Sequence, residues 1–319
     1  MRRAFVTGAH GVVGRWLVEA LLERGVAVTV LKRSPDKPSA LAMEGLEARC
    51  TVVPGDVADP AGLKRAVAGH DTVFHLAAQS IVGTANRSPL PTFETNVRGT
   101  WNALDACRLH GVERVVVAAS DKVYGPQAPL PYREDSHFEA QFSYDVSKAC
   151  ADLIARSYFR TLALPVAVAR VANVYGPGDL ETSRLVPELA ASMLAGRAPV
   201  IRSDGSPERD YIYASDAAAA YVAIAEAITA GGAAGEAFNV GAGEPRAVRE
   251  LVALLLDVTG ADVAADYRGT GVPAGEIDRQ WVDSSKLRAL TGWRPRIDLR
   301  EGLRRTVAWY RAHPGALGA

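Results

Sequence analysis

Tyr144 and Lys148 are four residues apart in a segment whose apolar residues have helical spacing, so the phenol and the ammonium lie about one turn apart on one face. A nearby ammonium favours the phenolate, and we expect Lys148 to lower the pKa of Tyr144 from its usual value near ~10. Ser120 ends an apolar run over 112–119, where its side chain would project at the carboxyl edge of a parallel sheet. These three residues could exchange protons with a substrate alcohol. The alternative for Tyr144 and Lys148 is an ordinary pair on a helix surface.

Asp121 and Lys122 place a carboxylate and an amine directly after Ser120. Removing water next to a ketone requires a base for a carbon-bound proton and an acid for the departing hydroxyl, two more titratable groups than an oxidation needs. Asp121 as the acid and Lys122 as the base would meet this requirement, and the reverse assignment stays open. A structural salt bridge at a loop edge is the alternative.

Gly8, Gly11 and Gly14 lie between an apolar β-run over 3–7 and a helical pattern over 12–24. In such a strand-to-helix turn, backbone N–H groups and the helix N-terminus can reach a pyrophosphate, and the last glycine lets the helix pack close to the sheet. We therefore expect a dinucleotide site. A tight turn that needs glycine for its own geometry is the alternative.

Lys32 and Arg33 follow the second apolar run, 28–31, where an acidic residue would bind the ribose 2′-hydroxyl of NAD. Cations suit a 2′-phosphate, so this pair slightly favours NADP over NAD as the cofactor. Solvated loop charges are the alternative interpretation.

Strands and helices alternate along the first part of the chain, which predicts an α/β fold with right-handed crossovers and a doubly wound parallel sheet of the Rossmann type. We expect strands over 3–7, 26–31, 49–53, 71–76, 112–119 and 165–170, and helices over 12–24, 60–68, 92–110 and 144–163. Residues 1–172 are predicted to form the cofactor-binding domain and 173–319 the substrate-binding part. We expect the latter to contain helices over 184–196, 216–228, 247–258 and 300–311, and brief strands around Tyr211, Phe238 and Val263.

The composition limits the function. The chain has 319 residues, 48% of them hydrophobic, and a formal net charge of zero, which argues against nucleic-acid and membrane-surface partners. Its longest wholly apolar stretch, 217–225, is far too short to span a bilayer. Three scattered cysteines fit a reducing compartment, so we expect a cytoplasmic protein, and six histidines without ligand spacing predict no metal site.

The ordered set of motifs resembles the extended short-chain dehydrogenase/reductase family, in its nucleotide-sugar epimerase/dehydratase branch, over nearly the whole chain. Besides the residues above, the resemblance rests on Asp56-Val57, His75-Leu76-Ala77-Ala78, Asn96-Val97-Arg98-Gly99-Thr100, Asn173-Val174-Tyr175-Gly176-Pro177-Gly178, Arg209-Asp210-Tyr211, Asn239-Val240-Gly241 and Gly292-Trp293-Arg294-Pro295. It implies a substrate-binding part that is interleaved with the first domain.

The resemblance also implies roles for residues of this chain. Ser120, Tyr144 and Lys148 match the catalytic triad of the family. The implied cofactor-binding residues are Gly8, His10, Gly11, Val12, Val13, Gly14, Lys32, Arg33, Asp56, Val57, Leu76, Ala77, Ala78, Asn96, Tyr144 and Lys148. The implied substrate-binding residues are Gln79, Ser120, Asn173 and Arg209, the last two at the substrate diphosphate.

The implied activity is a nucleotide-sugar 4,6-dehydratase with a tightly held, recycled cofactor. Asp121-Lys122 together with Gln79 most resembles CDP-glucose 4,6-dehydratases. The segments Val123-Tyr124-Gly125 and Arg209-Asp210-Tyr211 look more like those of 4-epimerases, which is the alternative. A non-enzymatic regulator is a minor alternative, for which a broken Tyr/Lys pair would be expected.

A homodimer is the expected assembly, because helices such as 92–110 and 144–163 commonly pack against their copies in this family. Trp101, Leu104, Leu153 and Ile154 could supply the apolar area. Alternatively, these side chains cover the sheet.

Overall fold

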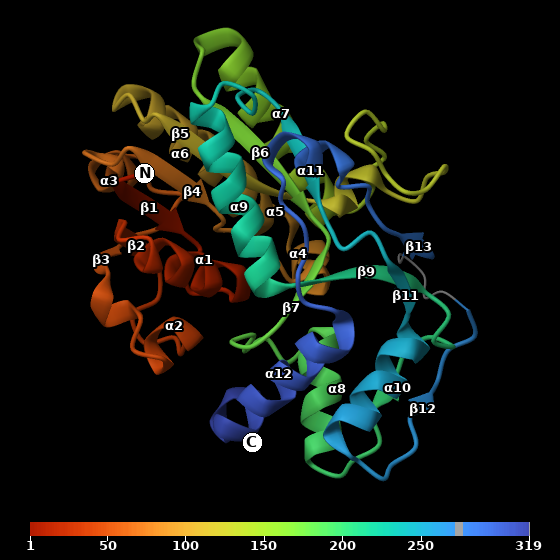
Figure 1. The fold of residues 1–319 in the computed structure, drawn as a ribbon. Helices are drawn as coiled ribbons and strands as arrows, with labels where there is room; N and C mark the ends of the chain where they lie inside the picture. Colours follow the sequence, from red (N-terminus) through yellow and green to blue (C-terminus); the bar gives the residue numbers. More distant parts are fainter. Residues whose placement is uncertain (272–276, 319) are drawn as a thin grey trace.

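A seven-stranded parallel sheet forms the centre of the first part of the chain, as seen in the computed structural model, which describes residues 1–271 and 277–318 (Figure 1). The strand order is β10-β6-β5-β4-β1-β2-β3. The strands are β1 (Arg3–Thr7), β2 (Ala27–Lys32), β3 (Thr51–Pro54), β4 (Thr72–His75), β5 (Arg114–Ser120), β6 (Val166–Val171) and β10 (Ala237–Val240). The predicted Rossmann-type sheet is confirmed.

The sheet is covered by helices on both faces because alternate residues of each buried strand point to opposite sides. In β5, Val116 belongs to one core, whereas Val115 and Val117 belong to the other. The first core includes helices α1 (Val12–Glu23) and α9 (Ala214–Thr229), which pack together in front of the sheet in Figure 1. The second core lies under α3 (Pro60–Val67), α6 (Gly99–Leu109) and α7 (Ser143–Leu162).

A smaller part lies beyond the carboxyl ends of the central strands, and it has its own apolar core between α8, α10 and α12 (Figure 1). Its elements are β7 (Asn173–Tyr175), α8 (Leu185–Leu194), β8 (Val200–Ile201), β9 (Glu208–Tyr213), β11 (Pro245–Ala247), α10 (Val248–Thr259), β12 (Asp266–Tyr267), β13 (Arg279–Gln280) and α12 (Leu299–Ala312). The helix α11 (Ser285–Thr291) instead packs against α9 and β10 of the large part. Because α9 and β10 return to the large sheet, the two parts are interleaved in sequence.

Of two expectations about local structure, the helix over 92–110 is confirmed with an earlier start and three segments, and the strand at Val263 is wrong. The helix predicted over 92–110 consists of α5 (Pro89–Phe93), a π-helical segment (Glu94–Arg98) and α6. Proline at the start of α5 fits a first helical turn, which moves the beginning of the helix upstream. No strand forms at Val263; the pairing lies at β12 instead, where the partner strand β8 sets the register.

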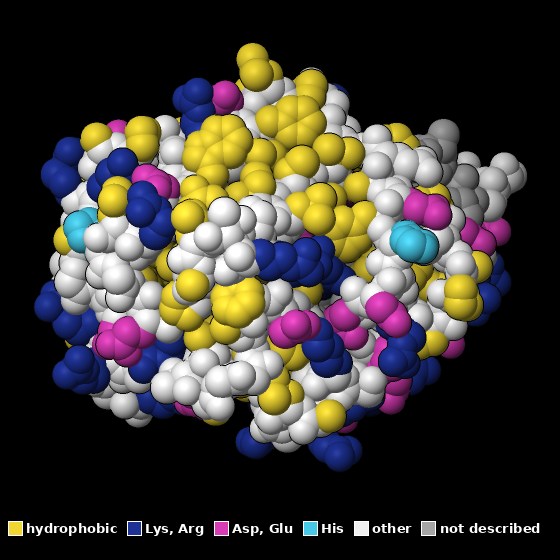
Figure 2. Space-filling view, turned by 90° about the horizontal axis from the view of Figure 1, so that it is seen from above, with side chains coloured by type: hydrophobic (Ala, Val, Ile, Leu, Met, Phe, Trp, Pro, Cys, Tyr) yellow, Lys and Arg dark blue, Asp and Glu magenta, His cyan; other side chains and the backbone are white. Residues whose placement is uncertain are grey.

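The side chains expected at a dimer contact differ in exposure. Trp101 is 42% exposed and Leu153 is 54% exposed, whereas Leu104 is fully buried in the core under α6. Leu104 therefore covers the sheet of its own chain, and Ile154 packs against the same core. Seen from above Figure 1, hydrophobic side chains gather over the upper middle of the face, and Lys or Arg side chains at its centre lie above a group of Asp and Glu side chains (Figure 2). None of the helices in the described residues has both the length and the apolar character that a bilayer span requires.

Candidate active site

The glycine loop between β1 and α1 is shaped by close backbone contacts. Gly8 has a φ of +73°, and a Cβ there would approach the backbone nitrogen of Ala77 to 2.7 Å. A Cβ at Gly14 would overlap the carbonyl oxygen of Gly8. At Gly11, by contrast, a Cβ would make only an ordinary van der Waals contact, 3.5 Å from the Gly8 carbonyl oxygen, and the residue is exposed, so this position is open to solvent.

The first turn of α1 follows this open position, with Gly11 as the N-cap and Val12 and Val13 as the first helical residues. Their N–H groups have no intrahelical acceptor, and the first turn carries no acidic side chain. Partial positive charge and open space at one point fit the diphosphate of a dinucleotide.

Lys32 at the end of β2 is engaged by an acidic residue that the sequence analysis did not identify. Its Nζ donates to both carboxylate oxygens of Glu47, at 2.9 and 3.1 Å, and Nε2 of His10 lies 2.8 Å from the same carboxylate. Burial disfavours ionisation of Glu47, but the hydrogen bonds from Lys32 and His10 outweigh it and lower its pKa. The positive charge of Lys32 is therefore balanced by the carboxylate of Glu47, whereas the neighbouring Arg33 is exposed.

The loop 76–79 after β4 is held at the carboxyl edge of the sheet by Asn96. Asn96 Nδ2 donates to the carbonyl oxygen of Gln79 at 3.2 Å and to Ser147 Oγ at 2.9 Å, and its Oδ1 accepts from the N–H of Gln79 at 2.7 Å. Asn96 is 1% exposed, so its side chain positions this loop. The N–H of Ala77 donates to Thr7 Oγ1, which also bonds to the ring of buried His75.

Asp56 and Val57, two of the residues expected to bind the cofactor, lie in the loop after β3. Asp56 Oδ1 accepts from the N–H of Ala58 at 2.8 Å, and Asn102 Nδ2 donates to the carbonyl oxygen of Val57 at 3.0 Å. These bonds fix the loop against α6.

Ser120, Tyr144 and Lys148 come together where the end of β5 meets the start of α7. Lys148 Nζ donates to the carbonyl oxygen of Ala118 at 2.9 Å, and burial lowers the pKa of Lys148 to about 8. Tyr144 is hydrogen-bonded to Ser120, and all three predicted triad residues are at most 8% exposed.

The expectation that Tyr144 has a lowered pKa is wrong for this structure. Burial, together with the negative charge of Asp121, raises the pKa of Tyr144 to about 12. Arg184 and the hydrogen bond to Ser120 oppose this rise without overcoming it. Helix spacing predicted the neighbourhood of Lys148 but not the loss of solvent, which acts more strongly on the phenol.

Asp121 and Lys122 begin a 3₁₀ turn, Asp121–Tyr124, directly after Ser120. Asp121 is 1% exposed, its Oδ1 accepts from Ser120 Oγ at 3.0 Å, and burial raises its pKa despite the nearby charge of Lys122. Lys122 Nζ donates to Gln280 Oε1 at 3.4 Å. Both residues are described, and they do not form an ion pair with each other, so the structure lacks the salt bridge of the structural alternative.

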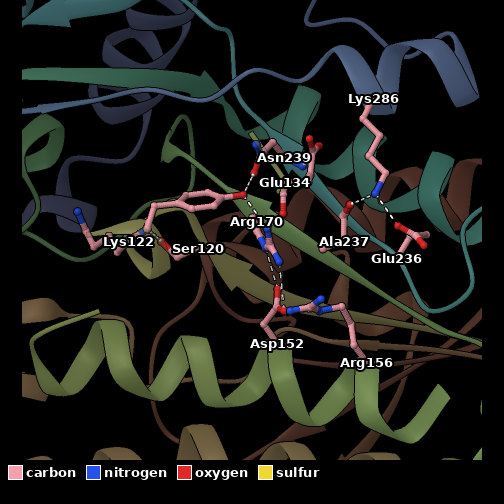
Figure 3. A network of polar contacts seen from close by, with 11 residues as sticks. Ser120, Lys122, Glu134, Asp152, Arg156, Arg170, Glu236, Ala237, Asn239 and Lys286 are labelled. Carbon is pink, nitrogen blue, oxygen red and sulfur yellow. Dashed lines mark hydrogen bonds and ion pairs between the residues drawn. The ribbon is translucent and has the colours of Figure 1, made fainter. Parts of the chain in front are cut away.

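A buried polar network lies behind this turn (Figure 3). Arg170, 1% exposed, donates from Nε to Asp152 Oδ2 at 2.8 Å and from Nη1 to the hydroxyl oxygen of Tyr124 at 2.7 Å. The Tyr124 hydroxyl donates to Asn239 Oδ1 at 2.7 Å, and the N–H of Asn239 donates to Glu134 Oε1 at 2.8 Å. Tyr124 thus anchors the turn that carries the Asp-Lys pair to β6 and β10.

Asn173 and Arg209, the predicted diphosphate contacts, lie on the neighbouring strands β7 and β9. Asn173 Nδ2 donates to the carbonyl oxygen of Asp210 at 3.3 Å, and Arg209 Nη1 donates to the carbonyl oxygens of Glu208 and Asp278 at 2.9 and 3.1 Å. The charge of Arg209 acts on Asp121, so the smaller part reaches the end of β5.

Asp210 adds a buried carboxyl group beside Asp121. It accepts from the N–H groups of Ala242 and Gly243 at 2.9 and 3.1 Å. Burial raises the pKa of Asp210 to about 7, and the charge of Asp121 acts in the same direction. The site therefore contains two carboxyl groups whose surroundings disfavour ionisation.

The structure adds four residues that sequence reasoning missed: Glu47, Arg184, Asp210 and Gln280. An acid 15 residues after Lys32 could have suggested a partner for that cation, whereas Gln280 is 158 residues from Lys122 and belongs to no local motif. Arg184 donates to Ser80 Oγ and Asp179 Oδ1. Only the pairing of β13 with β9 brings Gln280 to the site.

Comparison with known proteins defines the class to which this site belongs. The sequence model of the NAD dependent epimerase/dehydratase family matches residues 4–241. The chain therefore belongs to this family and is an enzyme.

Individual relatives cover nearly the whole chain. A dTDP-glucose 4,6-dehydratase from Streptomyces griseus is 35% identical, with 97% of this chain and 94% of the relative covered. A UDP-glucose 4-epimerase from Mycolicibacterium smegmatis is 32% identical, with 97% and 98% covered. The solved dTDP-glucose 4,6-dehydratase from Streptomyces venezuelae, with NAD bound, has a TM-score of 0.90 and 33% identity, with 98% of each chain covered. The UDP-glucose 4-epimerase from Thermotoga maritima also has a TM-score of 0.90, with 28% identity and with 98% of this chain and 99% of that chain covered.

These relatives support the predicted nucleotide-sugar dehydratase class but not the CDP-glucose type. The CDP assignment depended on Asp121-Lys122 and Gln79, residues near the sugar chemistry. Residues near the reacting sugar indicate which reaction takes place there. They do not contact the nucleotide base, so they could not identify CDP-glucose as the substrate.

Proposed function

We propose that this enzyme is a nucleotide-sugar 4,6-dehydratase, with dTDP-glucose as the first substrate to test. The proposal rests mainly on one observation at the end of β5. Asp121 is buried and hydrogen-bonded to Ser120, and Lys122 follows it in the chain with its amine bonded to Gln280. A 4-epimerase needs proton transfer only at the 4-hydroxyl. An acid and a separate base beside that group are what an elimination adds.

The first proton transfer is assigned to Tyr144 and Ser120. When NAD is bound, it supplies a reversible hydride acceptor for C4 of the sugar. Tyr144 would exchange the proton of the 4-hydroxyl, with Ser120 linking it to Asp121 through hydrogen bonds. Because the pKa of Tyr144 is about 12, its own proton is retained at neutral pH, and the neighbouring hydroxyl and charges must assist its transfer.

The second pair of transfers is assigned to Asp121 and Lys122. The 4-keto group acidifies the C5 proton, which Lys122 would remove. Burial raises the pKa of the Asp121 carboxyl, which favours the proton-bearing form that an acid for the departing 6-hydroxyl requires. Loss of that hydroxyl as water would leave a double bond between C5 and C6; when the hydride is returned to C6, Lys122 would give its proton back to C5, which yields the 4-keto-6-deoxy sugar.

We propose NAD as the cofactor and not the NADP that Lys32 and Arg33 favoured. Glu47 neutralises Lys32 through two hydrogen bonds, and its carboxylate can accept a hydrogen bond from a ribose 2′-hydroxyl while repelling a 2′-phosphate. The related dehydratase from Streptomyces venezuelae and the UDP-glucose 4-epimerase from Thermus thermophilus were solved with NAD. Gly8, Gly11, Gly14 and the loops 56–57 and 76–79 would hold the rest of the dinucleotide.

Residues 1–172 with α9 and β10 are proposed to bind the cofactor, and the remainder of 173–319 to bind the sugar nucleotide. Arg209 and Asn173 would contact the diphosphate. We further propose a cytoplasmic homodimer, supported by free thiols at the three cysteines and by the exposed Trp101 and Leu153 on α6 and α7.

The test is the mass of the product. Purified enzyme is incubated with dTDP-, UDP- and GDP-hexoses in separate reactions, with NAD present. A product lighter than the substrate by one water is expected from at least one of them. A product of unchanged mass but altered sugar configuration would establish the 4-epimerase, which the similarity to epimerases of 28–32% identity keeps as the second candidate.

A further inference from the structure

Gln280 approaches the Asp-Lys pair from the other part of the molecule. The Oε1 atom of Gln280 lies 3.4 Å from Lys122 Nζ, and the Gln280 residue is completely buried. The strand that carries it, β13, runs parallel to β9 with Gln280 opposite Arg209. Gln280 therefore lies between the group assigned to the C5 proton and the arginine assigned to the diphosphate.

Two buried polar atoms flank Lys122 without a hydrogen-bond partner among the described residues, Gln280 Nε2 and Asp121 Oδ2. Leaving such atoms unpaired costs free energy, and folded proteins rarely tolerate it without a function. One is a donor, and the other is the acidic oxygen of a carboxyl group. Together they present hydrogen-bonding groups to a ligand with several oxygens, such as a sugar.

The orientation of the Gln280 amide follows from its contact. An amine can donate to an amide oxygen but not to an amide nitrogen, so the Lys122 contact assigns Oε1 and turns Nε2 away from it. The following residues hold this arrangement. The N–H of Tyr132 donates to the carbonyl oxygen of Trp281 at 2.9 Å, and the N–H of Asp283 donates to the carbonyl oxygen of Tyr132 at 2.8 Å. On the other side of Gln280, the N–H of Glu208 donates to the carbonyl oxygen of Asp278 at 2.9 Å, so the strand is fixed at both ends and can position another group accurately.

We propose that Gln280 is a positioning residue for Lys122 and that its Nε2 donates a hydrogen bond to an oxygen of the bound sugar nucleotide during elimination. The inference rests on the proposed dehydratase function. A neutral amide suits this task, because it orients the amine without a negative charge. A base must be free of its extra proton to accept the one at C5, and a carboxylate at this position would retain it.

The experiment compares Gln280→Met and Gln280→Glu with the wild-type holoenzyme, each also in a Lys122→Met background. Gln280→Met removes both hydrogen bonds at similar volume, and elimination should slow at least tenfold while the absorbance of reduced nicotinamide accumulates. In the Lys122→Met background the same change should slow elimination by a smaller factor, because only the hydrogen bond from Gln280 Nε2 to the sugar is then lost.

Gln280→Glu keeps the size of the side chain and places a carboxylate beside Lys122. Elimination should be slow at neutral pH and should recover as the pH rises, whereas C4 oxidation should stay near the wild-type rate. The other charged groups around this position are Asp121, Arg209 and Asp210, and they are the same in the wild type and in Gln280→Glu. A difference between the two pH profiles therefore comes from residue 280. This variant also gives a result if Gln280→Met fails to fold.

Gln127→Met is the matched control. Gln127 donates to the carbonyl oxygens of Tyr124 and His137, so its loss removes an amide close to the same turn without touching Lys122. It should lower thermal stability without accumulating reduced nicotinamide. Normal elimination in both Gln280 variants, or an equal loss with and without Lys122, would overturn the inference alone. If the wild type forms no product lighter by one water, the dehydratase proposal and the inference both fail.

Discussion

Asp121→Asn removes the proton that the proposed mechanism delivers to the departing 6-hydroxyl, with little change in side-chain size. Ser120 Oγ donates to Asp121 Oδ1 at 3.0 Å, and an amide oxygen can accept the same bond, so Ser120 and Tyr144 keep their arrangement. Loss of a general acid typically costs a factor of ~10²–10⁴ in rate. This factor corresponds to about 3–5 kcal/mol of transition-state stabilisation. We expect elimination to slow accordingly while oxidation at C4 continues.

The assay follows reduced-nicotinamide absorbance in a single turnover and the product mass in parallel. Absorbance should rise and persist in Asp121→Asn, but should decay in the wild type as product forms. Asp216→Asn is the matched control, because Asp216 is also buried, at 5% exposure, and accepts the N–H groups of Arg296 and Ile297 at 3.0 Å each. It should lower stability and leave elimination intact. Near-wild-type elimination in Asp121→Asn would refute the acid assignment.

The pH dependence gives a second readout of the same residue. Burial raises the pKa of Asp121, so its carboxyl retains a proton to higher pH than an exposed aspartate would. Elimination in the wild type should therefore decline as the pH rises through this pKa. Asp121→Asn should lack that decline, and an unchanged profile in the variant would show that another group is titrating.

Three further predictions concern the cofactor, the core and the assembly. Glu47→Ala should raise the affinity for NADP relative to NAD at least tenfold in calorimetric titrations, because Lys32 becomes available to the 2′-phosphate; an unchanged ratio would contradict the role of Glu47. Asp152→Ala should lower the free energy of unfolding by about 3–5 kcal/mol in urea titrations, because Arg170 would keep a buried, unpaired charge. Adding Arg170→Met to Asp152→Ala should recover part of the lost free energy of unfolding. A loss below about 1 kcal/mol in Asp152→Ala alone would contradict the argument. Trp101→Ser with Leu153→Ser should shift the light-scattering mass from dimer to monomer, and a monomeric wild type would exclude the dimer.

Local sequence patterns were sufficient for the framework of the cofactor site. Glycines between a short apolar strand and an amphipathic helix predicted the β1–α1 loop, since only glycine permits the approach of Gly8 to Ala77 and the packing at Gly14. Tyr144 and Lys148 were placed correctly because helix geometry converts a spacing of four into a shared face. These features depend on neighbours close in the chain.

Tertiary structure decided the charges and partners of the same residues. Lys32 looked like a phosphate-binding cation until the fold placed Glu47 against it, and Tyr144 has a raised pKa because packing removes water from its phenol. Gln280 meets Lys122 only because a two-residue strand pairs with β9. Electrostatic and desolvation effects depend on distances through space, and these distances are set when segments far apart in sequence pack together. The sequence by itself therefore determined which residues form the candidate site, and the tertiary structure determined the hydrogen-bond partners and the pKa shifts of these residues.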